Sequence, residues 1–295
     1  MSVRAPRAPL PVGRATLAVL LAAMSFATIS IATVVATRAG TPLATVITGR
    51  FALTALLLAA LARGRGGLRA PGSTVPRLLL VGGGMQALIN VLNLSALAYL
   101  PAATTVFLFY TYPAWVAVLA ALRGTERVDA GRVAALLLAL AGIVILVGAP
   151  GSVALPAAGV ALSLAGAFCY AVYIPILHDF EARTSAAATT FHVAVGVTVL
   201  MGVGALWRGE LRVPPAAGWG AIAWLAVVPT VVAFQAFLRG LATLGPVRTA
   251  ILSCAEPFAA ALFGALVLGQ PITTGTMAGG GCIAAAVLLL QRRAG

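Results

Sequence analysis

Lysine is missing from this chain of 295 residues, and all 19 of its basic residues are arginine. A Walker A phosphate loop and a Schiff-base enzyme both need a lysine, so P-loop nucleotide hydrolysis and imine chemistry are excluded. Acidic residues are scarce as well, since Asp and Glu together number six, and the formal net charge is +13. The arginines lie between apolar runs rather than on one face, so we expect no nucleic-acid partner.

Metal-ligating and nucleophilic residues are also few. The cysteines Cys169, Cys254 and Cys282 lie in apolar runs at no metal-ligand spacing, so packing is their expected role. The chain contains no His-Glu-x-x-His, Cys-x-x-Cys or Gly-x-Ser-x-Gly motif. We therefore expect no metal site, no cofactor and no catalytic residue. A membrane-embedded enzyme remains the alternative from another class.

Charged residues of either sign make up only 8% of the chain, whereas hydrophobic residues make up 61%. A soluble domain of this length would have too little polar surface to cover itself. The composition predicts an all-α polytopic membrane protein whose surroundings are the lipid bilayer. We assign ten transmembrane helices to the apolar runs 16–37, 43–62, 78–99, 102–122, 133–147, 156–177, 187–207, 219–237, 247–268 and 274–290.

An internal repeat relates the two halves of the chain. Shifting the segment 97–127 by 144 positions onto 241–271 matches identical residues at Leu97, Ala98, Leu100, Thr105, Leu108, Pro113, Ala117, Ala121 and Leu122. Each half then holds five helices, and because five is odd, the second half must enter the membrane in the opposite direction. We predict a cytoplasmic tail at 1–14 and two inverted five-helix repeats at 15–149 and 156–291.

The arginine distribution predicts the orientation. With the N-terminus in the cytoplasm, fourteen arginines fall in cytoplasmic segments and only Arg38, Arg208 and Arg212 fall in outer loops. This positive-inside asymmetry, with the even number of helices, predicts that both termini are cytoplasmic. The predicted location is the inner cell membrane.

The most specific motif begins with Ala255-Glu256-Pro257-Phe258 and ends with Leu268-Gly269-Gln270. This phrase, the Gly49-Arg50-Phe51 triplet and the five-plus-five repeat resemble the drug/metabolite transporter superfamily, in its EamA-type branch. The resemblance covers essentially the whole chain and implies carrier transport, commonly the export of amino acids or other metabolites. The chain departs from that branch at Gln270, where an acid often stands, and at Tyr112, which precedes Pro113 where the second half has a glutamate.

Glu256 is the one acidic residue inside an apolar run, about 15 Å deep in the ninth predicted helix. A charge in hydrocarbon is costly, so this carboxylate should face protein or a water-filled path. It could couple transport to protons, bind a substrate amine, or brace a helix kinked at Pro257, which lacks a backbone donor. Pro113, its repeat counterpart, is the second predicted kink.

Arg50 is the second predicted intramembrane charge, about 10 Å below the outer surface. It could hold a substrate carboxylate, neutralise an acid, or bond carbonyl groups at a neighbouring helix end. We favour the last of these interpretations.

Gln86, Asn90 and Asn93 share one face of the third predicted helix, because residues three and four apart are neighbours. Such a polar stripe faces protein or water rather than lipid. Inverted symmetry should place the helices of Pro113 and Pro257 on opposite sides of one path. We predict a cavity lined by predicted helices one, three, four, six, eight and nine, with substrate contacts from Asn90, Tyr110, Tyr170, Gln235 and Glu256.

The fifth and tenth predicted helices lack acids, and Gly275 and Gly279 give the tenth a small-xxx-small face. We expect these helices to pack against each other or against a second subunit, which would form a homodimer.

The inverted repeat predicts an inner-membrane secondary transporter that works by alternating access, and the resemblance implies that it exports amino acids or related small metabolites. A carrier of drugs or other metabolites, working in uptake or exchange, is the alternative, because direction depends on gradients.

Overall fold

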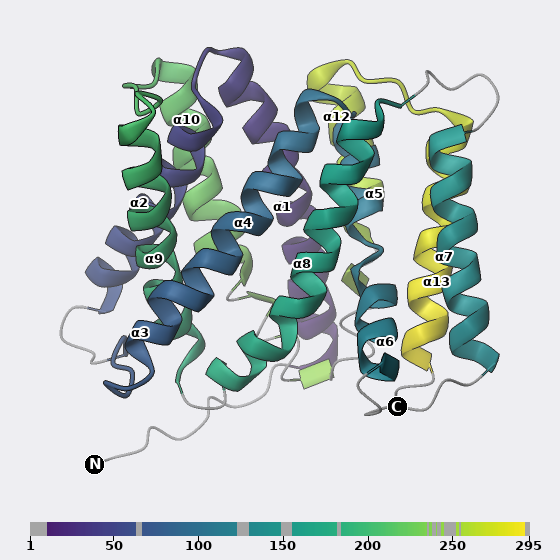
Figure 1. The fold of residues 1–295 in the computed structure, drawn as a ribbon, viewed down its shortest axis with the longest axis horizontal. Coiled ribbons are helices and arrows are strands. Elements are labelled where there is room, and N and C mark those ends of the chain that lie inside the picture. Colours follow the sequence, from purple (N-terminus) through teal and green to yellow (C-terminus); the bar gives the residue numbers. More distant parts are fainter. Residues whose placement is uncertain are drawn as a thin grey trace.

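The computed structural model describes residues 11–62, 67–122, 130–148, 155–181, 184–234 and 255–292, with the short pieces 236–237, 240, 243–244 and 252–253. Within these ranges all regular structure is helical and no strand occurs (Figure 1). The first repeat contains α1 (Val12–Arg38), α2 (Leu43–Ala62), α3 (Val75–Arg77), η1 (Leu78–Gly82), α4 (Gly83–Ser95), η2 (Ala96–Ala98), α5 (Ala102–Phe109), α6 (Tyr112–Leu122) and α7 (Ala130–Gly148). The second contains α8 (Ala157–Glu181), α9 (Ala186–Trp207), α10 (Ala216–Leu225), η3 (Ala226–Ala233), α12 (Ala255–Leu268) and α13 (Thr274–Arg292).

Among the described residues, six helices are long and apolar enough to cross a membrane. They are Val12–Arg38, Leu43–Ala62, Val75–Ala98, Ala157–Ile176, Ala187–Trp207 and Ala216–Ala233. Shorter apolar helices occupy Val133–Ile145, Ala255–Leu268 and Thr274–Leu289. The chain is thus a multi-pass membrane protein, as the composition predicts. Figure 1 shows α1 beginning and α13 ending at the same edge of the helix bundle.

The fourth predicted helix is interrupted rather than continuous. The chain leaves helical geometry at Tyr110 and Thr111, so that α5 ends at Phe109 and α6 begins at Tyr112. Pro113 has no N–H to donate to the carbonyl of Phe109 four residues earlier, which removes a helical hydrogen bond at this point. The interruption directs Tyr110 toward the second repeat.

Helix packing follows the repeat. Under the 144-residue offset, α1 corresponds to α8, α2 to α9, η1 and α4 to α10 and η3, α6 to α12, and α7 to α13. The counterpart of α5, at 246–253, lies mostly outside the described residues. Extensive contacts join α2 to α9 and α7 to α13, which are each other's counterparts. The contact of α1 with α12 is mirrored by that of α8 with α6, and the contact of α1 with η3 by that of α8 with α4. The two halves are therefore packed with an approximate two-fold relation.

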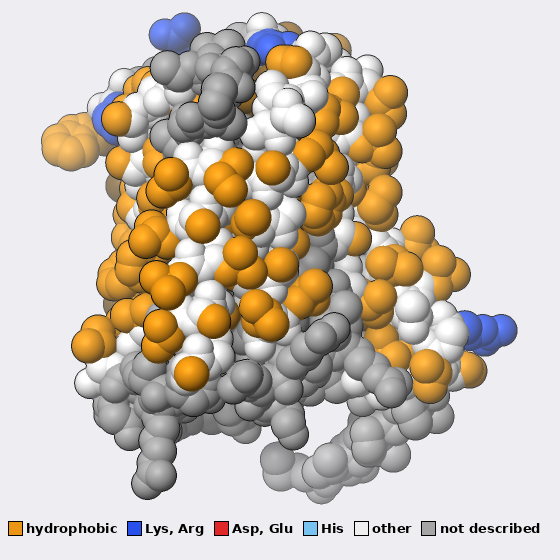
Figure 2. Space-filling view, turned by 90° about the vertical axis from the view of Figure 1, so that its right-hand side faces the viewer, with side chains coloured by type: hydrophobic (Ala, Val, Ile, Leu, Met, Phe, Trp, Pro, Cys, Tyr) orange, Lys and Arg blue, Asp and Glu red, His pale blue; other side chains and the backbone are white. Residues whose placement is uncertain are grey.

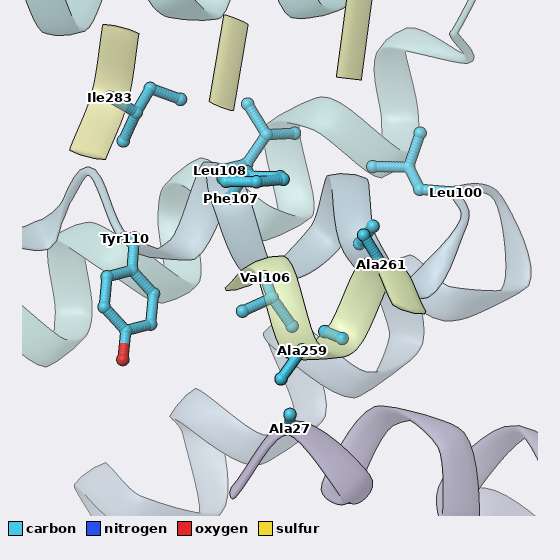
Figure 3. Close-up of a cluster of buried hydrophobic side chains, with 11 residues drawn as sticks. Ala27, Leu100, Val106, Phe107, Leu108, Tyr110, Ala259, Ala261 and Ile283 are labelled. Carbon is cyan, nitrogen blue, oxygen red and sulfur yellow. The ribbon is translucent and has the colours of Figure 1, made fainter. Parts of the chain in front are cut away.

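The central apolar cluster surrounds α5, whose residues from Ala102 to Leu108 are all buried. Phe107 and Leu108 pack there against Ala260 of α12 and Ile283 of α13. Figure 3 shows Tyr110 at the edge of this cluster, with its hydroxyl directed away from the apolar side chains. The same helix thus supplies both packing and one polar group of the site below.

Close helix crossings depend on glycine. A Cβ on Gly83 would lie 2.8 Å from the Cα of Gly196, so α4 and α9 meet backbone to backbone. A Cβ on Gly142 of α7 would lie 2.8 Å from the carbonyl oxygen of Gly279 in α13. The fifth and tenth predicted helices therefore pack against each other, which is one of the two expected arrangements. Contact with a second subunit stays a prediction.

The outer face of the α7–α13 pair is apolar. Leu137, Leu140 and Val144 of α7 are exposed, as are Met277 and Leu289 of α13. Figure 2, which looks onto this side of the molecule, shows hydrophobic side chains spread over the face and Arg side chains only at its margins. An exposed apolar surface of this extent is suited to lipid rather than to water.

Candidate functional site

A cavity of about 160 Å³ lies between the two repeats. Phe26 of α1 and Tyr170 of α8 both line it, and these residues are repeat counterparts under the 144-residue offset. Gln86 of α4 and Thr230 of η3 also line it and are counterparts in the same way. The cavity therefore lies where the approximate two-fold relation brings equivalent positions together, as expected for a site at a repeat interface.

Arg50 of α2 is the charged residue that lines this cavity among the described residues. Its side chain is buried, with only 7% of its surface exposed. The guanidinium Nε donates to the Thr230 hydroxyl at 3.0 Å, and Cζ lies 5.2 Å from the Phe51 ring centre, within cation–π range. The hydrogen-bond partner is thus a side-chain hydroxyl rather than the carbonyl groups that we favoured from the sequence.

Thr230 is positioned by a π-helical segment. Pro229 has no N–H to donate to the carbonyl of Leu225 four residues earlier, and the Thr230 hydroxyl donates to that carbonyl at 2.7 Å. Because the single hydroxyl hydrogen is used in this way, the Thr230 oxygen is left to accept from Arg50. The proline therefore fixes the orientation of the group that holds the guanidinium.

Glu256 lies beside a second hydroxyl. The Oη of Tyr110 is 2.7 Å from Glu256 Oε2 and 3.0 Å from the carbonyl oxygen of Ser253. Pro257, in the first turn of α12, cannot donate to Ser253 four residues earlier, and the Tyr110 hydroxyl reaches that carbonyl instead. This contact joins the two repeats through their proline-bearing helices.

Aromatic rings connect the glutamate region to the cavity. Tyr110 and Tyr112 have ring centres 6.0 Å apart, and Tyr112 lies 4.9 Å from Tyr170, which lines the cavity. Phe109 also packs on Tyr170, at 5.2 Å. Glu256 itself is not among the residues that line the cavity. The predicted substrate contacts Tyr170 and Glu256 therefore lie at the two ends of this aromatic series.

The three residues of the polar stripe in the third predicted helix, Gln86, Asn90 and Asn93, lie in three different environments. Gln86 lines the cavity, whereas the side chain of Asn90 is buried and donates to the backbone carbonyl of Gln86 at 2.7 Å. Asn93 packs against Gly166 of α8, and its Oδ1 is a buried atom with no partner among the described residues. Gln235, the remaining predicted contact, lies outside the described residues.

Thr230 is the principal cavity residue that our reading of the sequence missed. A threonine in an apolar run carries little signal by itself, because its hydroxyl can bond to its own helix. The repeat contains the missing signal, since the 144-residue offset aligns Thr230 with Gln86. Gln270, which departs from the acid frequent in the branch, accepts a hydrogen bond from the backbone N–H of Ala102 at 3.0 Å and so caps α5.

Apolar helices of membrane-spanning length, packed as two repeats around a small cavity with polar anchors, define a multi-pass membrane protein of the transporter class. The profile of the EamA-like transporter family matches residues 13–148 and again residues 157–292. The chain therefore belongs to this family, and the resemblance to the drug/metabolite transporters is confirmed. The two matches begin 144 residues apart, which is the offset of the predicted repeat.

One similar protein agrees with this assignment, and a second shares the fold. A protein of Archaeoglobus fulgidus described as an uncharacterized transporter is 28% identical over 190 residues, or 64% of this chain and 67% of that protein. One protein of known crystal structure is 23% identical and superposes with a TM-score of 0.65, covering 96% of this chain and 99% of the other. The second likeness concerns the fold alone.

Proposed function

We propose that the protein is a secondary carrier of the inner cell membrane that exports amino acids or related small metabolites by alternating access. The cavity between repeat counterparts is the observation that carries this proposal, because rocking of two related halves would open such a site to either side in turn. We further propose ten transmembrane helices in two inverted repeats with both termini in the cytoplasm. The symmetric helix contacts and the common edge of α1's start and α13's end support this topology.

The size and lining of the cavity favour small metabolites over drugs. About 160 Å³ is below the ~300–1,000 Å³ typical of sites for drug-sized ligands. A larger groove of about 420 Å³ between α1, α10 and α12 is lined by apolar side chains and Thr28, whose hydroxyl already accepts from Trp224. That groove lacks a charged anchor, so we place the substrate in the smaller cavity.

A membrane-embedded enzyme is the less favoured alternative. The family and the archaeal relative are both named as transporters. The described residues contain no group of three His, Cys, Asp or Glu side chains that could hold a metal ion. Carrier function is therefore the better proposal.

We also propose that Glu256 exchanges a proton during transport. The Tyr110 hydroxyl has one hydrogen and two acceptors in reach, the Ser253 carbonyl and the Glu256 carboxylate. When Glu256 is protonated, it can donate to Tyr110 while Tyr110 donates to Ser253, and both contacts are hydrogen bonds. When Glu256 is ionised, the two acceptors compete for one hydrogen. Loss of the proton therefore alters the contact between the repeats.

Transport is tested by counterflow into proteoliposomes loaded with single unlabelled amino acids and other small metabolites. Labelled solute should accumulate transiently when it matches the internal one, and Leu137→Ala, on the exposed face of α7, should behave as wild type. No counterflow with any solute of the panel would contradict carrier function.

Two further measurements address coupling and topology. Glu256→Gln keeps the shape of the side chain without its charge, and it should remove the response of transport to an imposed pH gradient. An unchanged response would leave Glu256 as a brace for the helix. Reporter fusions at Gly66 and Gly151 should report opposite sides of the membrane, and the same side for both would contradict the inverted topology.

A further inference from the structure

We infer that Arg50 is the counter-ion of the substrate, so that the cavity binds small monocarboxylates that have an apolar or aromatic body. The proposal rests on the proposed carrier function and specifies which chemical group the carrier recognises. It commits to the carboxylate as the essential group, and an ammonium group is not required.

The hydrogen bonds of Arg50 leave its carboxylate-binding edge available. Nε is the one guanidinium nitrogen with a hydrogen-bond partner among the described residues. The two terminal nitrogens have no hydrogen-bond partner among the described residues, and they belong to a side chain that lines the cavity. A planar guanidinium with two free terminal N–H groups matches the two oxygens of a carboxylate.

The described part of the chain supplies no anion for this cation. Among the described residues, no carboxylate lies within ion-pair distance of Arg50. Glu256, the acid within an apolar run, is bonded to Tyr110 and does not line the cavity. A buried cation without an anion is costly, and a bound carboxylate would remove that cost.

The walls of the cavity define the remainder of the ligand. Phe26, Phe51 and Tyr170 present aromatic surface, and Gln86 with Thr189 provides neutral polar groups. No acidic side chain lines the cavity within the described part of the chain, so an organic cation would meet Arg50 without compensation. A single arginine matches one negative charge, which favours a monoanion over a phosphate ester.

The experiment compares three ligands of nearly equal shape on the full-length protein in nanodiscs: 3-phenylpropanoate, its neutral amide 3-phenylpropanamide, and the cation 3-phenylpropylamine. Isothermal titration calorimetry should give a dissociation constant at least about tenfold lower for the carboxylate than for the amide, because a charge-assisted pair is lost in the amide. The amine should bind most weakly. Equal binding of carboxylate and amide, tighter binding of the amine, or no binding of the carboxylate would overturn the proposal.

Variants assign the preference to Arg50. Arg50→Gln should bind the carboxylate and the amide equally, whereas Arg50→Lys should keep part of the preference as a point charge without the planar fork. Arg38→Gln, which removes an exposed arginine at the end of α1, is the matched control and should keep the full preference. Size-exclusion profiles report whether each variant is folded. If Arg50→Gln does not fold, the comparison of the three ligands on the wild-type protein tests the proposal.

The binding and counterflow experiments distinguish failure of the carboxylate site from failure of the carrier function. Arg50-dependent binding without counterflow would contradict the carrier function and leave the carboxylate site intact. Counterflow of solutes irrespective of a carboxylate would support the carrier and overturn the site.

Discussion

Two charged residues in apolar helices of this protein, Arg50 and Glu256, each contact a hydroxyl group. The two networks differ in how many hydrogens they have for their acceptors. Thr230 donates to the Leu225 carbonyl and accepts from Arg50, so one hydroxyl hydrogen satisfies the whole network. Tyr110 has one hydrogen for the Ser253 carbonyl and the Glu256 carboxylate. In both networks the carbonyl lies four residues before a proline, Pro229 or Pro257.

The difference between the networks suggests different roles. In the arginine network, the Thr230 hydroxyl and Arg50 Nε each have a hydrogen-bond partner without any change of protonation. The two terminal nitrogens of Arg50 remain for a ligand of the cavity, which suits recognition. The glutamate network, as the described residues form it, has one hydroxyl hydrogen for two acceptors and lies between packed helices, which suits a change of protonation state. We expect variants at the two sites to separate binding from pH response.

The largest expected effect distinguishes the two charges by affinity. Arg50→Gln should raise the dissociation constant for 3-phenylpropanoate at least about tenfold, because a charge-assisted bond worth ~1.5–3 kcal/mol is lost. Glu256→Gln should change it less than about twofold, because Glu256 does not line the cavity. Calorimetry on both variants measures this difference, and equal losses would mean that both charges belong to one site.

A smaller effect is expected from the hydroxyl of Tyr110. Tyr110→Phe should lower the stability of the protein by about 1–3 kcal/mol, because a partly buried carboxylate and a carbonyl lose a donor. Thermal unfolding in nanodiscs measures the change, and Tyr99→Phe, on an exposed ring, is the control. Added to Glu256→Gln, the tyrosine variant should cost less than it does alone, since the two residues share one interaction. Strict additivity would contradict the network.

The hydrogen bond from the Ala102 backbone N–H to Gln270 joins the two repeats through a neutral acceptor. Variants of Gln270 test whether a neutral acceptor stabilises this contact as well as a charged one. Gln270→Ala should cost about 1 kcal/mol, as expected for loss of a helix cap, because the N–H of buried Ala102 loses its acceptor. Gln270→Glu keeps an acceptor near the positive end of α5 and should match or exceed wild-type stability. Thermal unfolding of the pair is the measurement, and a destabilising glutamate would show that its desolvation outweighs the cap.

The smallest expected effect concerns Thr230. Thr230→Val removes the hydroxyl that holds Nε but leaves the cation in the cavity, so the dissociation constant for 3-phenylpropanoate should rise only about twofold to tenfold. Thr230→Ser keeps the hydroxyl and should restore most of the affinity. Calorimetry on the two variants distinguishes positioning by the hydroxyl from packing of the methyl group. A larger loss for serine than for valine would show that the methyl group is what matters.

The helices and the family were predictable because both follow from local patterns. Apolar runs are long and separated by arginine-rich or proline-bearing loops, so most of their bounds lie within a few residues of the observed helices. The start of the ninth predicted helix, at 247, lies outside the described residues. The 144-residue offset appears in the sequence as scattered identities and in the family matches as two equal ranges. The break at Tyr110 and Thr111 was not predicted, because Pro113 marks a kink without specifying how far before it the helix ends.

The candidate site was only partly predictable because it depends on which face each helix turns inward. The sequence singled out Arg50, Glu256, Gln86 and Tyr170 as polar or aromatic residues in apolar surroundings, where such residues must face protein or water. Only the tertiary structure decided which of them meet. It placed Arg50 against Thr230 from the other repeat, and Glu256 against Tyr110. The rotation of each packed helix, and the partner of each carbonyl group that a proline leaves without a helical donor, depend on contacts between segments far apart in the chain.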